Sequence, residues 1–262
     1  MGGLAGLLGA LLGLGGGVFL VPFLVGVLGQ PFPISRGVSL MTVIATSSVV
    51  ASGGSGRALI NLRLAMLLQV ATAAGGLTGG ATADLISERV LTALFGAVTL
   101  LVAIVMLVRL DRRNIILDPG IDPGRFGGRF FEHESGQEVV YRIKRFPLAL
   151  VVSFAGGNIS SLLGIGGGIL MVPALNAFCG VPMRAAAATS SFMIGITAVS
   201  AVPIYYVRGE VVPHLAAAAV VGVLAGSRLG MRFAIRMRAK RLKLLMIAVL
   251  IAVTLLMAWR LR

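Results

Sequence analysis

The chain has 262 residues, of which 57% are hydrophobic and 12% charged, and its mean hydropathy is +0.99. A soluble domain cannot bury so much apolar surface, so these values predict a protein that spans a lipid bilayer several times. The formal net charge of +14 does not indicate nucleic-acid binding, because Lys and Arg stand at the ends of apolar segments and no basic groove with interleaved aromatic residues is present.

The first apolar stretch, residues 2–35, contains 34 residues without a charge. As one straight helix it would be roughly 50 Å long, which exceeds the thickness of a membrane. Gly15, Gly16 and Gly17 interrupt it near its middle, and consecutive glycines are unfavourable inside a helix. We therefore predict two half-helices that meet at a glycine break, either as a re-entrant hairpin or as a broken span.

Three further apolar segments complete a predicted first membrane repeat, residues 1–110. The segments are residues 37–56, 64–83 and 90–108, and each approaches or exceeds the length needed to cross the bilayer. Residues 111–145 then have the composition of a soluble segment, and their end resembles two short strands around residues 134–137. We predict a cytoplasmic linker with a short hairpin, and a docking site for a partner is the alternative.

The second half of the chain repeats the first after 151 residues. Residues 12–22 read LGLGGGVFLVP, and residues 163–173 read LGIGGGILMVP. The uncharged stretch 146–183 is again too long for one helix, and Gly166, Gly167 and Gly168 interrupt it. The apolar segments 185–207, 211–227 and 244–259 complete a second membrane repeat, residues 146–262. A matching interruption in each of two halves is typical of membrane transporters.

The basic residues discriminate between two topologies. If each interrupted segment folds back, 18 of the 23 Lys and Arg residues lie in the cytoplasm and 5 lie outside. If all eight segments cross, 10 lie in the cytoplasm and 13 lie outside. The first arrangement obeys the positive-inside rule, and its odd number of crossings inverts the second half. The predicted fold is thus an all-α polytopic membrane protein with two inverted repeats, each a glycine-broken, re-entrant helical hairpin plus three transmembrane helices.

The glycine breaks are the first candidates for a binding site. A helix that begins inside the membrane exposes unpaired backbone amides and a partial positive charge, which together favour an anion. Nearby hydroxyl and amide side chains could also donate to an anion, although such groups often bond to their own or a neighbouring helix. These further candidates are Ser39, Thr42, Asn158, Ser160, Ser161, Thr189, Ser190 and Ser191.

The other sequence patterns indicate structural roles or the absence of a catalytic site. No Asp or Glu lies in the middle of an apolar segment, and no catalytic triad or HExxH motif is present, so we expect neither an enzyme nor a cofactor or metal site. Arg57 and Arg208, 151 residues apart, resemble interfacial anchors. The pairs Gly75 with Gly79 and Gly226 with Gly230 indicate close helix contacts, either between the halves or in a homodimer.

Residues 157–201, GNISSLLGIGGGILMVPALNAFCGVPMRAAAATSSFMIGITAVSA, resemble the second signature of the TauE/SafE sulfite exporter family. Residues 4–22 and 37–40 resemble the first signature, and the resemblance extends over essentially the whole chain. The first copy departs from the pattern, since Leu7 stands in place of Asn158, and Val38-Ser39-Leu40 in place of Thr189-Ser190-Ser191.

The resemblance implies export of sulfite, sulfonates such as sulfoacetate, or related sulfur-containing anions across the bacterial cytoplasmic membrane. We therefore expect a multi-pass exporter that works by alternating access and holds its small anionic substrate at the half-helix N-termini. The alternatives are an anion channel, an uptake carrier, or a membrane scaffold whose linker binds a partner.

Overall fold

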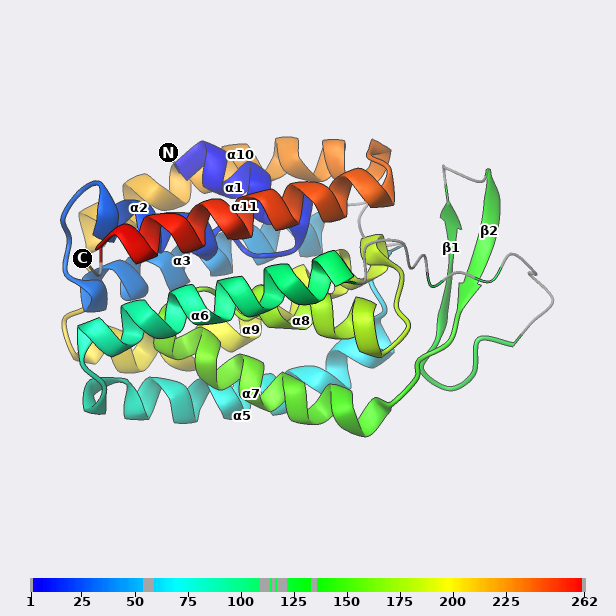
Figure 1. The fold of residues 1–262 in the computed structure, drawn as a ribbon, viewed down its shortest axis with the longest axis horizontal. Coiled ribbons are helices and arrows are strands. Elements are labelled where there is room, and N and C mark those ends of the chain that lie inside the picture. Colours follow the sequence, from blue (N-terminus) through cyan, green and yellow to red (C-terminus); the bar gives the residue numbers. More distant parts are fainter. Residues whose placement is uncertain are drawn as a thin grey trace.

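The computed structural model describes residues 2–53, 59–108, 114, 116, 122–132 and 136–260. Within these residues it is a helical bundle with a two-stranded hairpin at one end (Figure 1). Seven of the described helices are long and apolar enough to cross a membrane, which confirms the prediction of an all-α polytopic membrane protein. They are α3 (Phe32–Ser52), α5 (Leu62–Thr82), α6 (Glu88–Val108), α7 (Phe146–Leu163), α9 (Met183–Val207), α10 (Pro213–Arg236) and α11 (Ala239–Arg260).

Both predicted glycine breaks are present. Helix α1 (Gly2–Leu12) ends before the first glycine triplet, and α2 (Gly17–Gly26) begins at the last glycine of that triplet. Likewise α7 ends before the second triplet, and α8 (Gly168–Pro173) begins at its last glycine and continues into a π-helical turn, η2 (Ala174–Phe178). The residues just before the new helices, Gly16 and Gly167, have φ angles of 75° and 79°. Only glycine adopts this left-handed conformation readily.

Each broken segment turns back toward the end of the bundle from which it started (Figure 1). Helix α1 runs inward from the end that holds the N-terminus, and α2 returns to that end. Helix α7 runs inward from the hairpin end, and α8 returns there. At 18 residues, α7 is longer than the half-helix that we expected and by length could cross a membrane alone.

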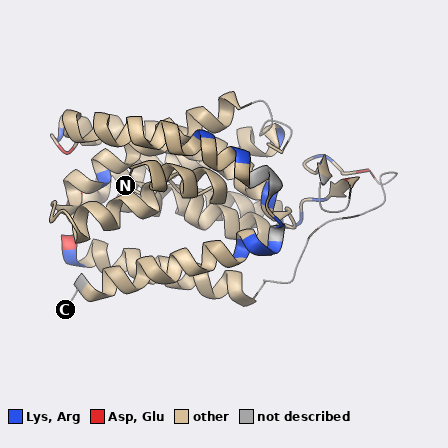
Figure 2. Ribbon diagram, turned by 90° about the horizontal axis from the view of Figure 1, so that it is seen from above, with Lys and Arg blue, Asp and Glu red and all other residues tan. Residues whose placement is uncertain are grey.

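The hairpin consists of β1 (Gly128–Glu132) and β2 (Gln137–Tyr141), which pair antiparallel with Gly128 opposite Tyr141. The predicted strands are therefore confirmed. Residues 133–135, which connect the two strands, lie outside the described residues, and so does Arg57. We call the end of the bundle beside these strands the hairpin end. Figure 2 shows that Lys and Arg gather at this end, as the positive-inside rule expects for a cytoplasmic face.

The two halves pack through contacts that occur twice. Gly79 of α5 lies so close to α7 that a methyl group on it would overlap the carbonyl oxygen of Asn158. Gly230 of α10 lies against α1 in the same way, at the carbonyl oxygen of Leu7. Both pairs of equivalent residues are 151 positions apart. The predicted close helix contacts are thus confirmed as contacts between the halves. Each half presents the same position to the other, as in a two-fold arrangement.

Replacing Gly79 with Ala should destabilise the protein, because the added methyl forces α5 and α7 apart. Overpacking of this kind costs about 1–3 kcal/mol, so the midpoint of thermal unfolding in detergent should fall by several degrees. Gly96→Ala is the control, since its methyl would meet the nearest atom, Cβ of Met257, at an ordinary 3.8 Å. Equal midpoints for the two variants would contradict the described packing of α5 on α7.

Candidate functional site

The two glycine breaks lie against each other. A methyl group on Gly17 would lie 2.6 Å from the carbonyl oxygen of Gly164, and one on Gly168 would overlap the carbonyl oxygen of Gly13. These two contacts are equivalent under the shift of 151 residues. Any side chain at Gly17 or Gly168 would separate the breaks, so their close approach requires glycine at both positions.

Two of the predicted hydroxyls hold the breaks together. Ser39 on α3 donates a hydrogen bond of 2.6 Å to the carbonyl of Gly164, and Ser190 on α9 donates one of 3.3 Å to the carbonyl of Gly13. Each serine thereby satisfies a carbonyl just beyond the C-terminus of a helix in the opposite half. Their hydroxyl protons are occupied in this conformation, so both residues act here as contacts between the halves.

The helices that start at the breaks leave backbone amides unpaired. No oxygen among the described residues accepts a hydrogen bond from the amides of residues 16–18 or 166–169, and neither helix start has a side-chain cap. All of these residues are buried. A buried amide without an acceptor is costly. Each break is therefore suited to an oxygen-bearing anion, whose charge the helix N-terminus also favours.

Further hydroxyls are concentrated on the second half of the chain. The Oγ atoms of Ser160, Ser161 and Ser191 are buried and have no hydrogen-bond partner among the described residues. A methyl on Gly167 would lie 3.5 Å from the Ser160 Oγ, which places that hydroxyl beside the second break. The Ser161 hydroxyl lies instead beside Gly76 of α5, where a methyl would be 3.2 Å away.

The first half lacks equivalents of all three hydroxyls. The residues that correspond to Ser160, Ser161 and Ser191 are Gly9, Ala10 and Leu40, none of which has a polar side chain. The Ser160 hydroxyl beside the second break therefore has no counterpart at the first break.

The remaining predicted site residues have other partners. Thr42 donates to the carbonyl of Ser39 in its own helix. The Thr189 hydroxyl accepts a bond of 3.0 Å from the backbone amide of Asn61, and the Asn158 amide donates to Thr78 on α5 at 3.0 Å. The structure thus gives each of these three side chains a hydrogen-bond partner outside the breaks.

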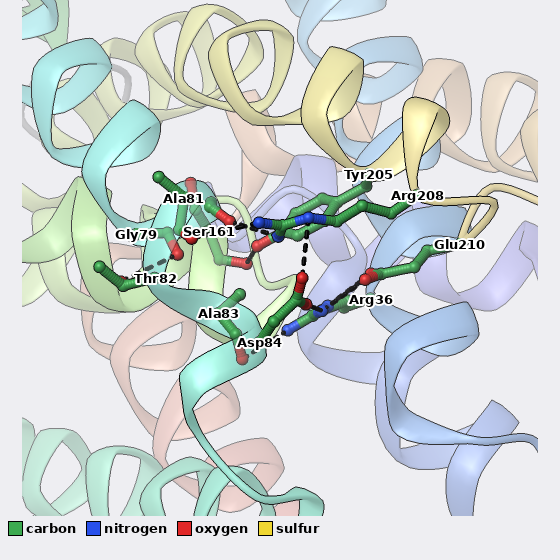
Figure 3. A network of polar contacts seen from close by, with 11 residues as sticks. Arg36, Gly79, Ala81, Thr82, Ala83, Asp84, Ser161, Tyr205, Arg208 and Glu210 are labelled. Atoms are coloured by element: carbon green, nitrogen blue, oxygen red, sulfur yellow. Dashed lines mark hydrogen bonds and ion pairs between the residues drawn. The ribbon is translucent and has the colours of Figure 1, made fainter.

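An ionic network that the sequence analysis did not predict lies at the end opposite the hairpin (Figure 3). Arg36, in the first turns of α3, is only 1% exposed. Its Nε and Nη2 atoms donate to the two carboxylate oxygens of Glu210 at 2.7 and 2.6 Å. Nη2 also lies 3.1 Å from the carboxylate of Asp84, beyond the C-terminus of α5.

Helix α9 supplies the rest of the network. The Tyr205 ring lies 4.6 Å from the Arg36 guanidinium, and its hydroxyl donates to the carbonyl of Ser161. Arg208 pairs with Asp84 at 2.9 Å and donates to two carbonyls at the end of α5. Arg208 therefore does more than anchor the chain at the interface. The signal that could have revealed the network is Arg36 itself, a lone charge between two long apolar segments.

Asn61 connects the hairpin to the membrane helices. Its side-chain oxygen caps α5 by accepting from the amide of Leu64. Its amide nitrogen donates to the Phe126 carbonyl at 2.8 Å and to the Tyr141 hydroxyl at 3.1 Å. Burial raises the pKa of Tyr141, an effect that the bond from Asn61 partly opposes, so the phenol is protonated at neutral pH.

Asn61→Asp should release the hairpin and preserve the helix. The carboxylate can still cap α5, but it cannot donate to Phe126 or Tyr141. We expect faster trypsin cleavage at Arg125 or Arg129 with little change in thermal stability, whereas Asn61→Ala should also lose the cap, at a cost of about 1 kcal/mol. Unchanged cleavage in both variants would show that Asn61 does not hold the hairpin.

Comparisons with known proteins agree with these observations. A probable membrane transporter protein, YunE of Bacillus subtilis (strain 168), is 26% identical over 261 residues, which cover 97% of this chain and 93% of that protein. No solved structure gives a significant match. The family model of the sulfite exporter TauE/SafE matches residues 1–257. The chain therefore belongs to the TauE/SafE family and is a multi-pass membrane protein of a transporter family.

Proposed function

We propose that the protein exports a small sulfur-containing anion, a sulfonate or sulfite, across the bacterial cytoplasmic membrane, and holds it where the two glycine breaks meet. The observation that carries this proposal is the pair of buried helix N-termini whose amides find no acceptor in the described part of the chain. The two N-termini come from opposite halves, and each packs against the opposite break, Gly17 at the carbonyl of Gly164 and Gly168 at the carbonyl of Gly13. An anion bound between them would therefore contact both halves.

The chemistry of the breaks favours a polyatomic oxyanion. Sulfite and sulfonates carry several oxygens on one sulfur atom, so one molecule can accept hydrogen bonds from both helix starts. The unpartnered Ser160 and Ser191 hydroxyls would add donors on the second half. Neither broken segment contains an Asp or Glu, nor does α3 or α9, so no carboxylate in these segments would repel the substrate.

The way in which the halves are joined supports a proposal of alternating access. The contacts between them are reciprocal and use small residues and single hydrogen bonds at the breaks. We infer that the halves are inverted repeats that rock about the bound anion, with the hairpin end in the cytoplasm. This orientation agrees with the gathering of Lys and Arg in Figure 2.

Export of an anion can proceed without a coupled ion. A negative-inside membrane potential favours the exit of each negative charge by about 2.3 kcal/mol per 100 mV. The absence of acidic residues from the broken segments fits such a potential-driven mechanism.

Anion flux into and out of proteoliposomes should therefore saturate, show counterflow, and respond to an imposed potential. These measurements with sulfite and with sulfoacetate separate the candidates. Flux that rises without saturation would indicate a channel, and saturable flux that ignores the potential would contradict potential-driven export.

Ser160→Ala and Ser191→Ala should each raise the half-saturation concentration of the anion. A hydrogen bond to a charged group contributes about 1.5–3 kcal/mol, so the expected rise is about ten-fold or more. Ser48→Ala is the matched control, because Ser48 is exposed and donates to Ile44 in its own helix. If all three variants transport as the wild type does, the anion does not bind at the second break.

A further inference from the structure

We propose that Arg36 is a second anion-binding residue on the exit path, and that Glu210 is the counter-ion which the transported anion replaces there. This inference rests on the proposed function, since it describes the step after the anion leaves the glycine breaks. Its structural basis is the network in Figure 3.

A buried guanidinium requires an anionic partner. Arg36 is 1% exposed and Glu210 is 7% exposed, and an unpaired charge at such a position costs several kcal/mol. Glu210 meets the requirement with two parallel hydrogen bonds. The same planar pair of donors fits two oxygens of a sulfonate or sulfite. A substrate anion can therefore take the place of the carboxylate without leaving Arg36 unpaired.

The Arg36 network clamps the two halves together. Arg36 and Asp84 belong to the first half, and Tyr205, Arg208 and Glu210 belong to the second. Any opening between the halves at this end must separate Arg36 from Glu210. Because the separation would leave Arg36 with Asp84 alone and Glu210 without its guanidinium, an anion that replaces Glu210 on Arg36 lowers the cost of opening.

The backbone that carries Arg36 borders the second break. A methyl group on Gly164 would lie 2.6 Å from the Cα atom of Arg36. The Tyr205 hydroxyl, whose ring contacts Arg36, donates to the Ser161 carbonyl in the last turn of α7. The network is therefore in contact with the second break, beside which the unpartnered Ser160 hydroxyl lies.

The equivalent positions at the hairpin end do not hold such an ion pair. The positions equivalent to Arg36 and Glu210 hold Ala187 and Leu59. Ala187 nevertheless contacts the first break as Arg36 contacts the second, since a methyl on Gly13 would lie 2.6 Å from the Ala187 carbonyl oxygen. The backbone contact is thus repeated at both ends of the bundle and the ion pair is not. We infer that the halves are held together by different contacts at the two ends.

Glu210 can leave and return because of its place in the chain. It lies in the short connection between α9 and α10, directly after Gly209, whose φ is 73°. Asp84 belongs to the same half as Arg36 and would stay beside it when Glu210 leaves. The return of the Glu210 carboxylate then displaces the anion from Arg36 and completes its release.

Glu210→Gln tests the exchange, because it preserves the side-chain shape and removes the competing charge. Titration calorimetry of the detergent-solubilised protein with sulfite and with methanesulfonate should show binding that is tighter by about ten-fold or more. Net efflux from proteoliposomes should fall by a similar factor, because nothing displaces the anion from Arg36. Glu88→Gln is the control, since Glu88 is an exposed carboxylate at the start of α6, near the same end.

A purely structural ion pair gives a different result, since Glu210→Gln would then bind the anions no more tightly than the wild type. That result, with a wild-type protein that binds and carries the anions, overturns the role of Arg36 and leaves the proposed function intact. A wild-type protein that neither binds nor carries them overturns both.

A measurement on the wild type covers the case in which Glu210→Gln does not fold. Saturating sulfite should increase hydrogen–deuterium exchange at the amides of residues 208–212, because Glu210 leaves its partner. The amides of Arg208, Gly209 and Glu210 are all hydrogen-bonded to α9 without the anion. Unchanged or slower exchange there would overturn the proposal.

Discussion

A helix that stops inside a membrane leaves amides and carbonyls without partners, and lipid cannot satisfy them. In this protein each half supplies what the other lacks at its break. Ser39 and Ser190 bond to carbonyls of the opposite break, and Gly17 and Gly168 allow the two breaks to touch. The carbonyls are satisfied in this way, whereas no described residue accepts a hydrogen bond from the amides at the helix starts. This difference leaves buried donors without acceptors at the centre of the protein, and the proposed anion site depends on it.

Because many contacts are repeated in both halves, the residues that occur in only one half are informative. The contacts of glycine with backbone and the bonds of Ser39 and Ser190 are repeated in both halves, whereas several other polar side chains are not. Ser160 and Ser191 occur only on the second half, and the pair of Arg36 with Glu210 occurs only at the end opposite the hairpin. A carrier that moves an anion in one direction benefits from unlike ends. In the mechanism that we propose, the symmetric backbone supports the movement, and the asymmetric side chains determine where the anion is held and where it is released.

The sequence predicted those features that depend on length and local composition. The two breaks follow from uncharged stretches that are too long for the membrane and contain glycine triplets, and Gly79 and Gly230 follow from their spacing. The partners of individual side chains could not be predicted in this way, because they depend on which helix face meets which neighbour. Thus Asn158 faces Thr78 on α5. Arg36 pairs with Glu210, 174 residues away, and both residues stand at segment ends, where charges are ordinarily exposed.

The central claim is that an anion binds between the two helix starts at the breaks. Selenite is a heavier analogue of sulfite, and the anomalous signal of its selenium locates it in crystals of the wild-type protein. The account predicts a peak within hydrogen-bonding distance of the amides of residues 16–18 and 166–169. A peak found only among the basic residues of the hairpin end, from protein that transports selenite in a saturable manner, would contradict it.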